Sequence, residues 1–483
     1  MADGAALGIV SQPQEQQLVD LHVEGKLPTW LSGSLLRTVP AQFEVGGRRI
    51  EHWFDGLAML NAFAFEDGKV SYTSRLLRSD TYRQALENGT RPRRGFANDP
   101  CVSVFKRAFS LFSPSVATLT DNGNVNIGKL GDRMVALTEA PMPVAFDPGT
   151  LETLGLVKHP DNVGYGHGTP HPHYDDNASM VNSVTTFGVR PHYRLYSVGA
   201  DARRHEIASM ATREPAYMHS FAITERHLVL IEQPFVIDPL EVILSRRPLR
   251  SLVDYFIWKP ERGTRLHVFS RATGERIKTV QTSAFFFFHT INAFDEGENV
   301  VIDFSCYANP DIVNAFFLET MQDATRGFPT ARPTRLCIGL RDGRVQQTQL
   351  ADLDFELPGI DSVRHDGRPY RFAYAVGRHE EREQSFWDQL VKLDTHNGEA
   401  TIWREAGTNP SEPTFVRGPG ADKNDGIVLS VVLDQGAKDS YLLVLDARSF
   451  TEIARARAPQ RIPFGFHGQH SYNLPDGVTK AVN

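Results

Sequence analysis

Residues 391–401 read VKLDTHNGEAT, which is an alternating strand, a polar turn at Asn397-Gly398, and the start of a second strand. The same order recurs in three further segments: 144–154 (VAFDPGTLETL), 268–277 (VFSRATGERI) and 443–453 (LVLDARSFTEI). Recurring hairpins of this kind are typical of the outer strands of β-propeller blades. The repeat therefore predicts an all-β fold and favours a β-propeller. The alternative is that these are ordinary hairpins of another all-β architecture.

The rest of the chain agrees with an all-β fold. Further hairpins are expected at 62–72, with Asp67-Gly68 at the bend, and around 341–344. Helical spacing of apolar residues is scarce, and residues 310–321 are its best example. Because no linker rich in Gly, Ser or Pro divides the chain, we expect a single closed domain over residues 1–483.

Composition excludes several classes of function. The chain has 483 residues, 41% of them hydrophobic, and a net charge of −7 without any block rich in Lys or Arg, which argues against a nucleic-acid partner. Its three cysteines, Cys101, Cys306 and Cys337, form no CxxC pair and suit a reducing compartment. No signal peptide and no apolar run long enough to span a membrane is present, so we expect a cytoplasmic protein.

Four histidines lie in apolar or constrained settings: His171 in GTPHPH (168–173), His219 in YMHSF (217–221), His289 after FFFF (285–288) and His467 in PFGFHG (463–468). Buried neutral imidazoles are the commonest metal ligands, and an all-nitrogen set suits iron, copper, nickel or zinc. These histidines are too far apart in sequence to form a local motif. A propeller would nevertheless bring them together, because the inner strands of its blades converge on one axis. Two alternatives stay open: that His173 is the ligand in place of His171, and that His289 is a packed core residue.

Three glutamates are candidates to support such histidines. Glu139 follows the apolar run 134–138, Glu356 lies in DFELP (354–358), and Glu412 lies between Ser411 and Pro413. A buried carboxylate is costly unless it is hydrogen-bonded, and an imidazole N–H would satisfy it.

The order of these segments resembles the carotenoid cleavage oxygenase family, which includes β-carotene, apocarotenoid and stilbene-cleaving dioxygenases and a retinoid isomerase. The resemblance covers residues 27–467, and residues 1–20 and 474–483 are expected to be peripheral. Besides the four histidine segments, it is carried by LPTWLSGSLLR (27–37), HWFDG (52–56), PSEPTFV (410–416) and DGIVLS (425–430).

The resemblance implies a seven-bladed β-propeller in which loops and short helices form a dome over a non-haem Fe(II) ion. It assigns His171, His219, His289 and His467 as metal ligands and Glu139, Glu356 and Glu412 as their outer partners, with no glutamate for the fourth histidine. It also implies a reaction in which O2 splits a C=C bond into two carbonyl products, chemistry that the iron supplies.

The substrate class is indicated by one position and by the block DGIVLSVV (425–432), which is more similar to the carotenoid and retinoid branch of the family. Stilbene-cleaving relatives carry a lysine directly before the first of these glutamates, whereas this chain has Thr138. By resemblance, Thr138 lies near the open metal position. We therefore expect a carotenoid, apocarotenoid or retinal-related polyene. A stilbenoid or lignostilbene is the alternative, and a non-oxidative retinoid isomerase and a non-catalytic scaffold are less favoured.

A membrane-dissolved polyene requires access to the membrane surface. Apolar residues within 235–256 alternate with Arg246, Arg247 and Arg250, which suits a peripheral patch on anionic lipid. Residues 105–112 could extend this patch. The alternative is that both segments only roof the propeller. The oligomeric state is not indicated by the sequence.

Overall fold

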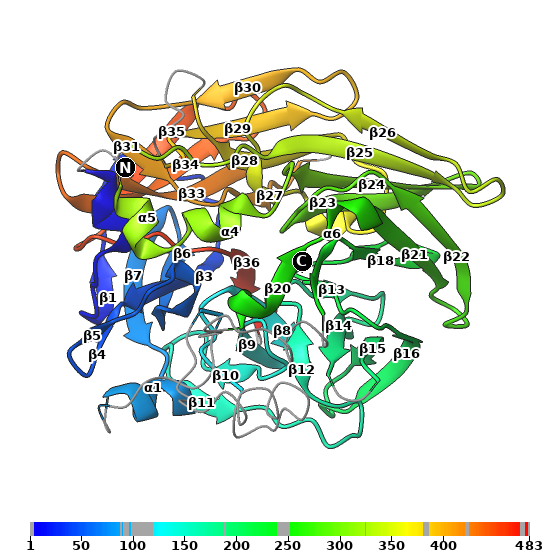
Figure 1. Ribbon diagram of the computed structural model, residues 1–483. Helices are drawn as coiled ribbons and strands as arrows, with labels where there is room; N and C mark the ends of the chain where they lie inside the picture. Colours follow the sequence, from blue (N-terminus) through cyan, green and yellow to red (C-terminus); the bar gives the residue numbers. More distant parts are fainter. Residues whose placement is uncertain are drawn as a thin grey trace.

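The computed structural model describes residues 4–481, apart from 87–88, 90–95, 98–118, 188–189, 239–251, 324, 380–385, 421–424 and 474–478. Within these residues, seven antiparallel sheets of four or more strands stand around a common centre as the blades of a propeller (Figure 1). The seven-bladed β-propeller expected from the sequence is therefore confirmed.

The first four blades follow one another along the chain. From the outermost strand inward, blade 1 contains β1 (Gln16–Asp20), β7 (Lys69–Leu76), β6 (Leu57–Glu66), β3 (Gly33–Gln42), β36 (Gly468–Asn473) and β37 (Thr479–Ala481). Blade 2 contains β11 (Thr153–Leu156), β10 (Val144–Phe146), β9 (Arg133–Leu137) and β8 (Asn126–Leu130). Blade 3 contains β16 (Arg204–Ala211), β15 (His192–Val198) and β14 (Met180–Thr186), with β12 (Gly166–Gly168) and β13 (His173–Tyr174) innermost. Blade 4 contains β22 (Arg276–Thr282), β21 (Thr264–Ser270), β18 (His227–Glu232) and β17 (Ala222–Ile223).

The remaining three blades complete the circle. Blade 5 contains β26 (Val345–Gln349), β25 (Arg332–Gly339), β24 (Asn299–Cys306) and β23 (Thr290–Glu296). Blade 6 contains β30 (Ala400–Trp403), β29 (Gln389–Asp394), β28 (Phe372–Gly377) and β27 (Glu356–Gly359). Blade 7 contains β2 (Val23–Gly25), β35 (Glu452–Arg457), β34 (Asp439–Asp446) and β33 (Gly426–Asp434), with β31 (Thr408–Pro410) and β32 (Thr414–Arg417) innermost.

Short elements connect and cover the blades. The two-stranded sheets are β4 (Glu44–Val45) with β5 (Arg48–Arg49) and β19 (Phe235–Ile237) with β20 (Phe256–Trp258). In the described parts of the chain, the α-helices are α1 (Asp80–Leu86), α4 (Asp311–Ala315), α5 (Leu318–Gln322) and α6 (Ser362–His365). The 3-10 helices are η1 (Ala5–Ile9), η2 (Trp53–Asp55), η3 (Val253–Tyr255) and η4 (Pro260–Arg262).

Both ends of the chain close the ring. Strand β36, near the C-terminus, pairs with β3 in blade 1, and strand β2, near the N-terminus, pairs with β35 in blade 7. Segments from opposite ends of the sequence thus complete the first and last blades. Radial closure of this kind leaves only short, protected sheet edges.

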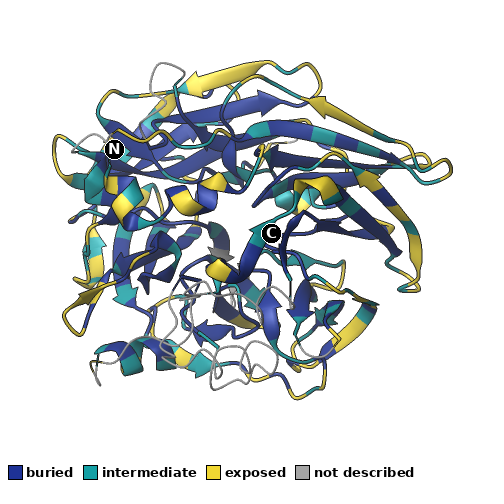
Figure 2. Ribbon diagram, in the orientation of Figure 1, coloured by how far each residue is buried: buried dark blue, intermediate teal, exposed yellow. Residues whose placement is uncertain are grey.

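Alternating side chains hold each blade to its two neighbours. In β33, Ile427 and Leu429 pack in the apolar cluster shared with blade 1, whereas Val428 and Val432 pack in the cluster shared with blade 6. Because side chains of a strand point to opposite faces in turn, a strand between two blades is apolar along its whole length. Figure 2 shows the result: the inner and middle strands are buried and exposed residues concentrate on the outermost strands.

The repeated segments are the outer hairpins of blades, as predicted. The four pairs are β10–β11, β21–β22, β29–β30 and β34–β35. At the turn between β29 and β30, Gly398 has φ of 78°, a left-handed conformation that glycine adopts without strain.

One expectation about local structure needs correction. The helix expected at 310–321 is two short helices, α4 and α5, because the intervening backbone pairs elsewhere: the Phe316 carbonyl accepts from Trp53 N and Leu318 N donates to the Glu51 carbonyl. The N-terminal residues pack against the outside of the propeller and its covering elements. Ala5 and Ile9 of η1 are buried in the largest apolar cluster, and β1 is the outer strand of blade 1.

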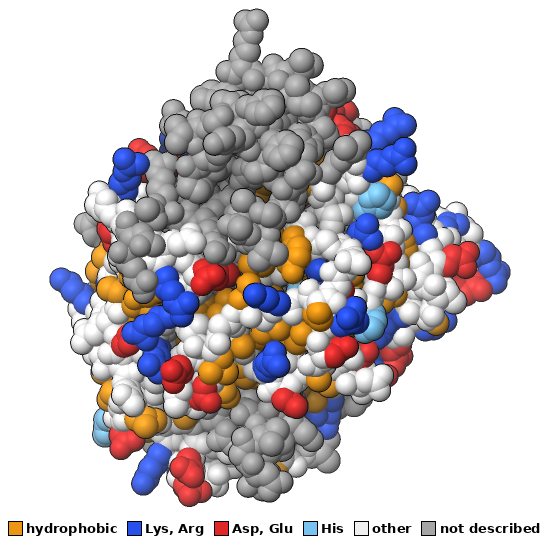
Figure 3. All heavy atoms as spheres, turned by 90° about the horizontal axis from the view of Figure 1, so that it is seen from below, with side chains coloured by type: hydrophobic (Ala, Val, Ile, Leu, Met, Phe, Trp, Pro, Cys, Tyr) orange, Lys and Arg blue, Asp and Glu red, His pale blue; other side chains and the backbone are white. Residues whose placement is uncertain are grey.

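The surface carries mixed charge. On the face shown in Figure 3, Lys and Arg side chains are interspersed with Asp and Glu, in keeping with the small net charge and the absence of a basic block in the sequence. Among the described residues, no helix is both long and apolar enough to cross a bilayer.

Candidate metal centre

Four histidines from four blades meet on the propeller axis. His171 lies between β12 and β13, and His219, His289 and His467 lie just before the inner strands β17, β23 and β36. Their candidate ligand nitrogens all lie within 4.8 Å of one another, and the cluster is largely buried. The fold thus brings together four residues that are widely separated in the sequence.

The hydrogen bonds of these histidines fix which nitrogen faces the centre. The Nδ1 atoms of His219, His289 and His467 lie 2.6 Å from carboxylate oxygens of Glu139, Glu356 and Glu412, respectively. Each Nδ1 therefore carries the proton and donates it, which leaves an unprotonated Nε2 turned toward the axis.

The spacing of the Nε2 atoms fits a metal ion. Nε2 of His171 lies 3.1 Å from Nε2 of His219, and Nε2 of His467 lies 3.0 Å from Nε2 of His289. In the His467–His289 pair both nitrogens present lone pairs, which repel unless a cation lies between them. Imidazole–metal bonds of about 2.1 Å, as in zinc sites, place two nitrogens at right angles about 3 Å apart. The residues present therefore fit a bound transition metal.

Each blade contributes one residue to this centre. Blades 3, 4, 5 and 1 supply the histidines, whereas Glu139 follows β9 of blade 2, Glu356 begins β27 of blade 6, and Glu412 lies between β31 and β32 of blade 7. Among the described residues, His171 has no carboxylate partner, as the resemblance implied for the fourth histidine.

The glutamates are held in turn by buried side chains. Tyr217 donates to Glu139, and Tyr307 donates to Glu356 at 3.1 Å. Glu412 is held by Arg37, whose Nη1 lies 3.5 Å from Oε2 and donates to the Glu412 carbonyl at 3.1 Å. Outer contacts of this kind fix the orientation of the imidazoles before a metal binds.

Burial sets the protonation of the site. It lowers the pKa of His171, His219 and His467 well below the usual range, and the neighbouring imidazoles lower it further. Neutral imidazoles are the form that binds metals. Burial also raises the pKa of Glu412 to about 7, although Arg37 opposes this shift.

His173 does not belong to the cluster. Its Nδ1 lies 2.8 Å from Asp366 and its Nε2 lies 3.2 Å from the Phe221 carbonyl, whereas His171 faces the other three histidines. His289 likewise presents Nε2 to the centre, so its role is not merely that of a packed core residue. Thr138 is buried directly before Glu139.

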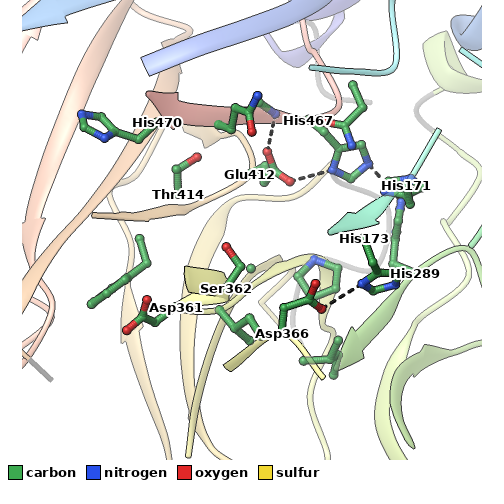
Figure 4. A pocket seen from close by; sticks show the side chains of 18 of the residues that line it. His171, His173, His289, Asp361, Ser362, Asp366, Glu412, Thr414, His467 and His470 are labelled. Atoms are coloured by element: carbon green, nitrogen blue, oxygen red, sulfur yellow. Dashed lines mark hydrogen bonds and ion pairs between the residues drawn. The ribbon is translucent and has the colours of Figure 1, made fainter. Parts of the chain in front are cut away.

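Two cavities of different character adjoin the histidines. The first, which we call the axial cavity, has a volume of about 240 Å³ and touches His171, His289 and His467 (Figure 4). The second, which we call the aromatic chamber, is small, with a volume of about 20 Å³, and touches His219, His289 and His467. Its other lining residues are Trp53, Phe54, Val125, Phe288, Phe316, Glu356, Leu357, Trp387 and Phe466.

Sequence reasoning misses several residues of this site. The sequence gives Phe54 no separate role at the site, but its ring lines the aromatic chamber and lies 6.4 Å from that of His219. The contributions of Arg37 and Tyr307 emerge only from the structure. Arg37 carries a signal that could have revealed it, because a charged residue within the apolar run of β3 must be paired if it is buried.

We expect Glu356→Gln to weaken the site without unfolding the protein. The amide cannot provide the negative charge that increases the basicity of His289, and loss of such an outer partner typically costs about 10–100-fold in metal affinity or activity. Metal affinity and turnover can both be measured on this variant. Glu298→Gln, on the exposed surface, is the matched control and should match wild type. Equal metal affinity in the Glu356 variant and wild type would contradict the role of this glutamate.

The fold and the centre together define a β-propeller protein whose axial four-histidine site fits a metal ion. Residues 9–472 match the family model described as "Retinal pigment epithelial membrane protein". The chain belongs to this family of carotenoid oxygenases.

The similarity to named relatives extends over nearly the whole chain. The carotenoid isomerooxygenase of Galleria mellonella is 35% identical, and the match covers 92% of each chain. The human β,β-carotene 15,15′-dioxygenase is 31% identical over 95% of this chain and 94% of its own. Among solved structures, a cobalt-substituted apocarotenoid oxygenase of Synechocystis matches with a TM-score of 0.84 and 25% identity, covering 97% of this chain and 98% of that one.

Proposed function

We propose that this protein is a non-haem Fe(II) dioxygenase that cleaves a C=C bond of a carotenoid or apocarotenoid into aldehyde or ketone products. The observation that carries the proposal is the set of convergent imidazoles, three of them backed by glutamates, beside an aromatic chamber. The relatives named as carotenoid-cleaving dioxygenases support the same reaction.

The protein's own residues have separable tasks in this proposal. His171, His219, His289 and His467 would hold the ion, and the iron, when bound, would supply activation of O2 that side chains cannot perform. Four neutral ligands leave the charge of the ion in place, and the three glutamates orient three of the rings and offset part of that charge.

The aromatic chamber supports an apolar substrate. Phe54, Phe288 and Phe466 line it beside the histidines, so it is the character of its lining, and not its present volume of about 20 Å³, that favours an apolar chain. The chamber would have to widen to admit a polyene, whose chain would then contact ring faces and edges. We place Thr138 near the open metal position. A threonine there, instead of the lysine expected for a phenolic stilbene, favours a carotenoid-type substrate.

The proposal is tested by aerobic incubation of the Fe(II)-loaded protein with β-carotene, a β-apocarotenal and resveratrol, followed by mass spectrometry of the aldehydes. Apocarotenoid aldehydes that form only with O2 are the expected result, and their chain length locates the cleaved bond. Phenolic aldehydes alone would assign the protein to stilbenoid cleavage, and isomerised products without O2 would exclude oxidative cleavage.

Membrane contact forms a separate part of the proposal. The two ends of the segment 235–256 are described by the structure. There, Phe235, Ile237, Val253 and Phe256 are buried in the protein's apolar interior and are not available to contact lipid. The middle of the segment, with its three arginines, lies outside the described residues, as does 105–112. We propose that the segment 235–256 contacts anionic lipid, with Leu244 and Leu249 among the residues that would enter it.

The double substitution Leu244→Asp and Leu249→Asp is expected to abolish co-sedimentation with anionic liposomes while iron content stays at the wild-type level, because it removes apolar side chains that would enter the lipid and puts in carboxylates that anionic headgroups repel. A double substitution of two exposed apolar residues elsewhere, Leu18→Asp and Leu154→Asp, is the matched control and should not reduce sedimentation. Undiminished sedimentation of the Leu244/Leu249 variant would refute membrane contact through this segment.

A further inference from the structure

The axial cavity runs along the inner strands of the propeller. Its lining includes residues from all seven blades, drawn from inner strands or from the residues shortly before them. These are, from blade 1 to blade 7, Gln469, Asn126, His173, Ser220, Thr290, Gly359 and Thr414. The cavity therefore occupies the axis itself, with His171, His289 and His467 in its wall.

The axial cavity is polar where the aromatic chamber is apolar. Figure 4 shows Asp361, Ser362, Asp366 and Thr414 around it together with the histidines. A polar space of about 240 Å³ holds several water molecules, since each takes up about 30 Å³ in the liquid. An ion that moves through this space keeps water and protein oxygen atoms around it.

One carboxylate in the cavity is distinguished by its partners. Asp361 is paired with Arg417, whose Nη2 lies 2.6 Å from Oδ1, and Glu412 is paired with Arg37. Asp366 is instead contacted by the imidazole of His173, at 2.8 Å, and by no guanidinium among the described residues. Its partner is therefore an imidazole, which can give up its proton and bind a metal, whereas a guanidinium cannot.

Asp366 also lies where the axial cavity meets a larger one. A second cavity, of about 890 Å³, shares Tyr174, Ser362, Val363 and Asp366 with it. Val363, on helix α6, is 44% exposed, so this junction lies at the protein surface. The path from the surface to the cluster therefore passes α6, Asp366 and His173, and reaches His171 two residues further back along the chain.

We propose that the axial cavity is the route by which the divalent metal ion enters the folded protein, with Asp366 and His173 as a transient binding pair on the way. The inference rests on the metal site of the proposed function. A carboxylate and an imidazole are ligands that divalent first-row metals accept, and a functional metal site requires an entry path.

The aromatic chamber is a poor route for the same ion. Any cation that reached His219 through it would pass Phe54, Phe288 and Phe466, which cannot replace the oxygen atoms of its hydration shell. Moving a charge into apolar surroundings without such partners carries a large free-energy cost. The two cavities thus separate the polar ion from the apolar substrate.

The experiment measures the rate at which folded, metal-free protein takes up Co(II), followed by its visible absorption. Val363→Trp narrows the entrance at an exposed position that should not disturb folding, and Asp366→Asn removes the charge with little change of shape. We expect both variants to bind as much Co(II) as wild type at equilibrium but to take it up more slowly, by roughly tenfold for Asp366→Asn because local negative charge raises the rate of cation association. Leu154→Trp, a similar change on the outer strand of blade 2, should take up Co(II) at the wild-type rate.

The possible results distinguish an error in the entry route from an error in the metal site. Wild-type uptake rates in both variants would overturn the axial route, as would wild-type protein that acquires Co(II) only when it is refolded. Failure of wild type to bind Co(II) at all would instead overturn the metal site and the proposed function with it.

Discussion

Replacing His219 with alanine is expected to abolish metal binding and catalysis while the propeller stays folded. His219 supplies one of the convergent Nε2 atoms, and its neighbours Glu139 and Tyr217 bond to each other without it. Loss of an outer partner alone typically costs about 10–100-fold, so we expect loss of a ligand to reduce activity by more than about 100-fold. Metal per chain, thermal unfolding and product formation are the measurements.

Two histidine variants serve as controls for this experiment. His205→Ala changes an exposed histidine on β16 and should retain full metal content. His173→Gln changes the histidine nearest to His171 in sequence and should also retain metal at equilibrium, since its ring faces Asp366. If His173→Gln lost the metal and His171→Gln kept it, the assignment of His171 as a ligand would be wrong.

Arg37→Met is expected to lower the free energy of unfolding by about 3–5 kcal/mol, because it leaves a buried carboxylate without its cation. Arg37 is 2% exposed, and besides Glu412 it bonds to the Phe466 carbonyl at 3.0 Å. The substitution should also weaken metal binding, since Glu412 orients His467. Chemical denaturation and Co(II) titration measure the two effects.

A double-mutant cycle separates charge from packing at this pair. Glu412→Gln in the Arg37→Met background removes the unpaired charge, so the double variant should be more stable than Arg37→Met alone. Additive losses from the two substitutions would show that Arg37 stabilises the protein through packing and its carbonyl contacts, not through Glu412.

The fold was predictable because its signal repeats. Each of the four repeated segments carries the same order of strand, turn and strand. The four histidines and three glutamates have apolar or constrained neighbours in the sequence, which indicates that they are buried and need polar partners. Their meeting was not predictable from spacing, since the ring of blades, and not a local motif, determines which residues converge.

What escaped prediction depends on contacts between distant segments. Residues 310–321 have helical spacing, yet their backbone pairs with residues 51–53 and splits the helix, because tertiary hydrogen bonds outweigh a weak local preference. Tyr307 lies on a connection after β24 with no local signal, and its contact with Glu356 appears only when blades 5 and 6 are adjacent. The axial cavity likewise exists only once seven inner strands surround it.

The four-histidine iron centre is tested most directly by the X-ray absorption spectrum of the Fe(II)-loaded protein at the iron edge, with iron per chain measured on the same sample. We expect one iron per chain with an inner shell of nitrogen and oxygen, scattering from four imidazole rings, and no sulfur. Sulfur in the inner shell, or markedly fewer imidazoles than four, would contradict the centre formed by His171, His219, His289 and His467.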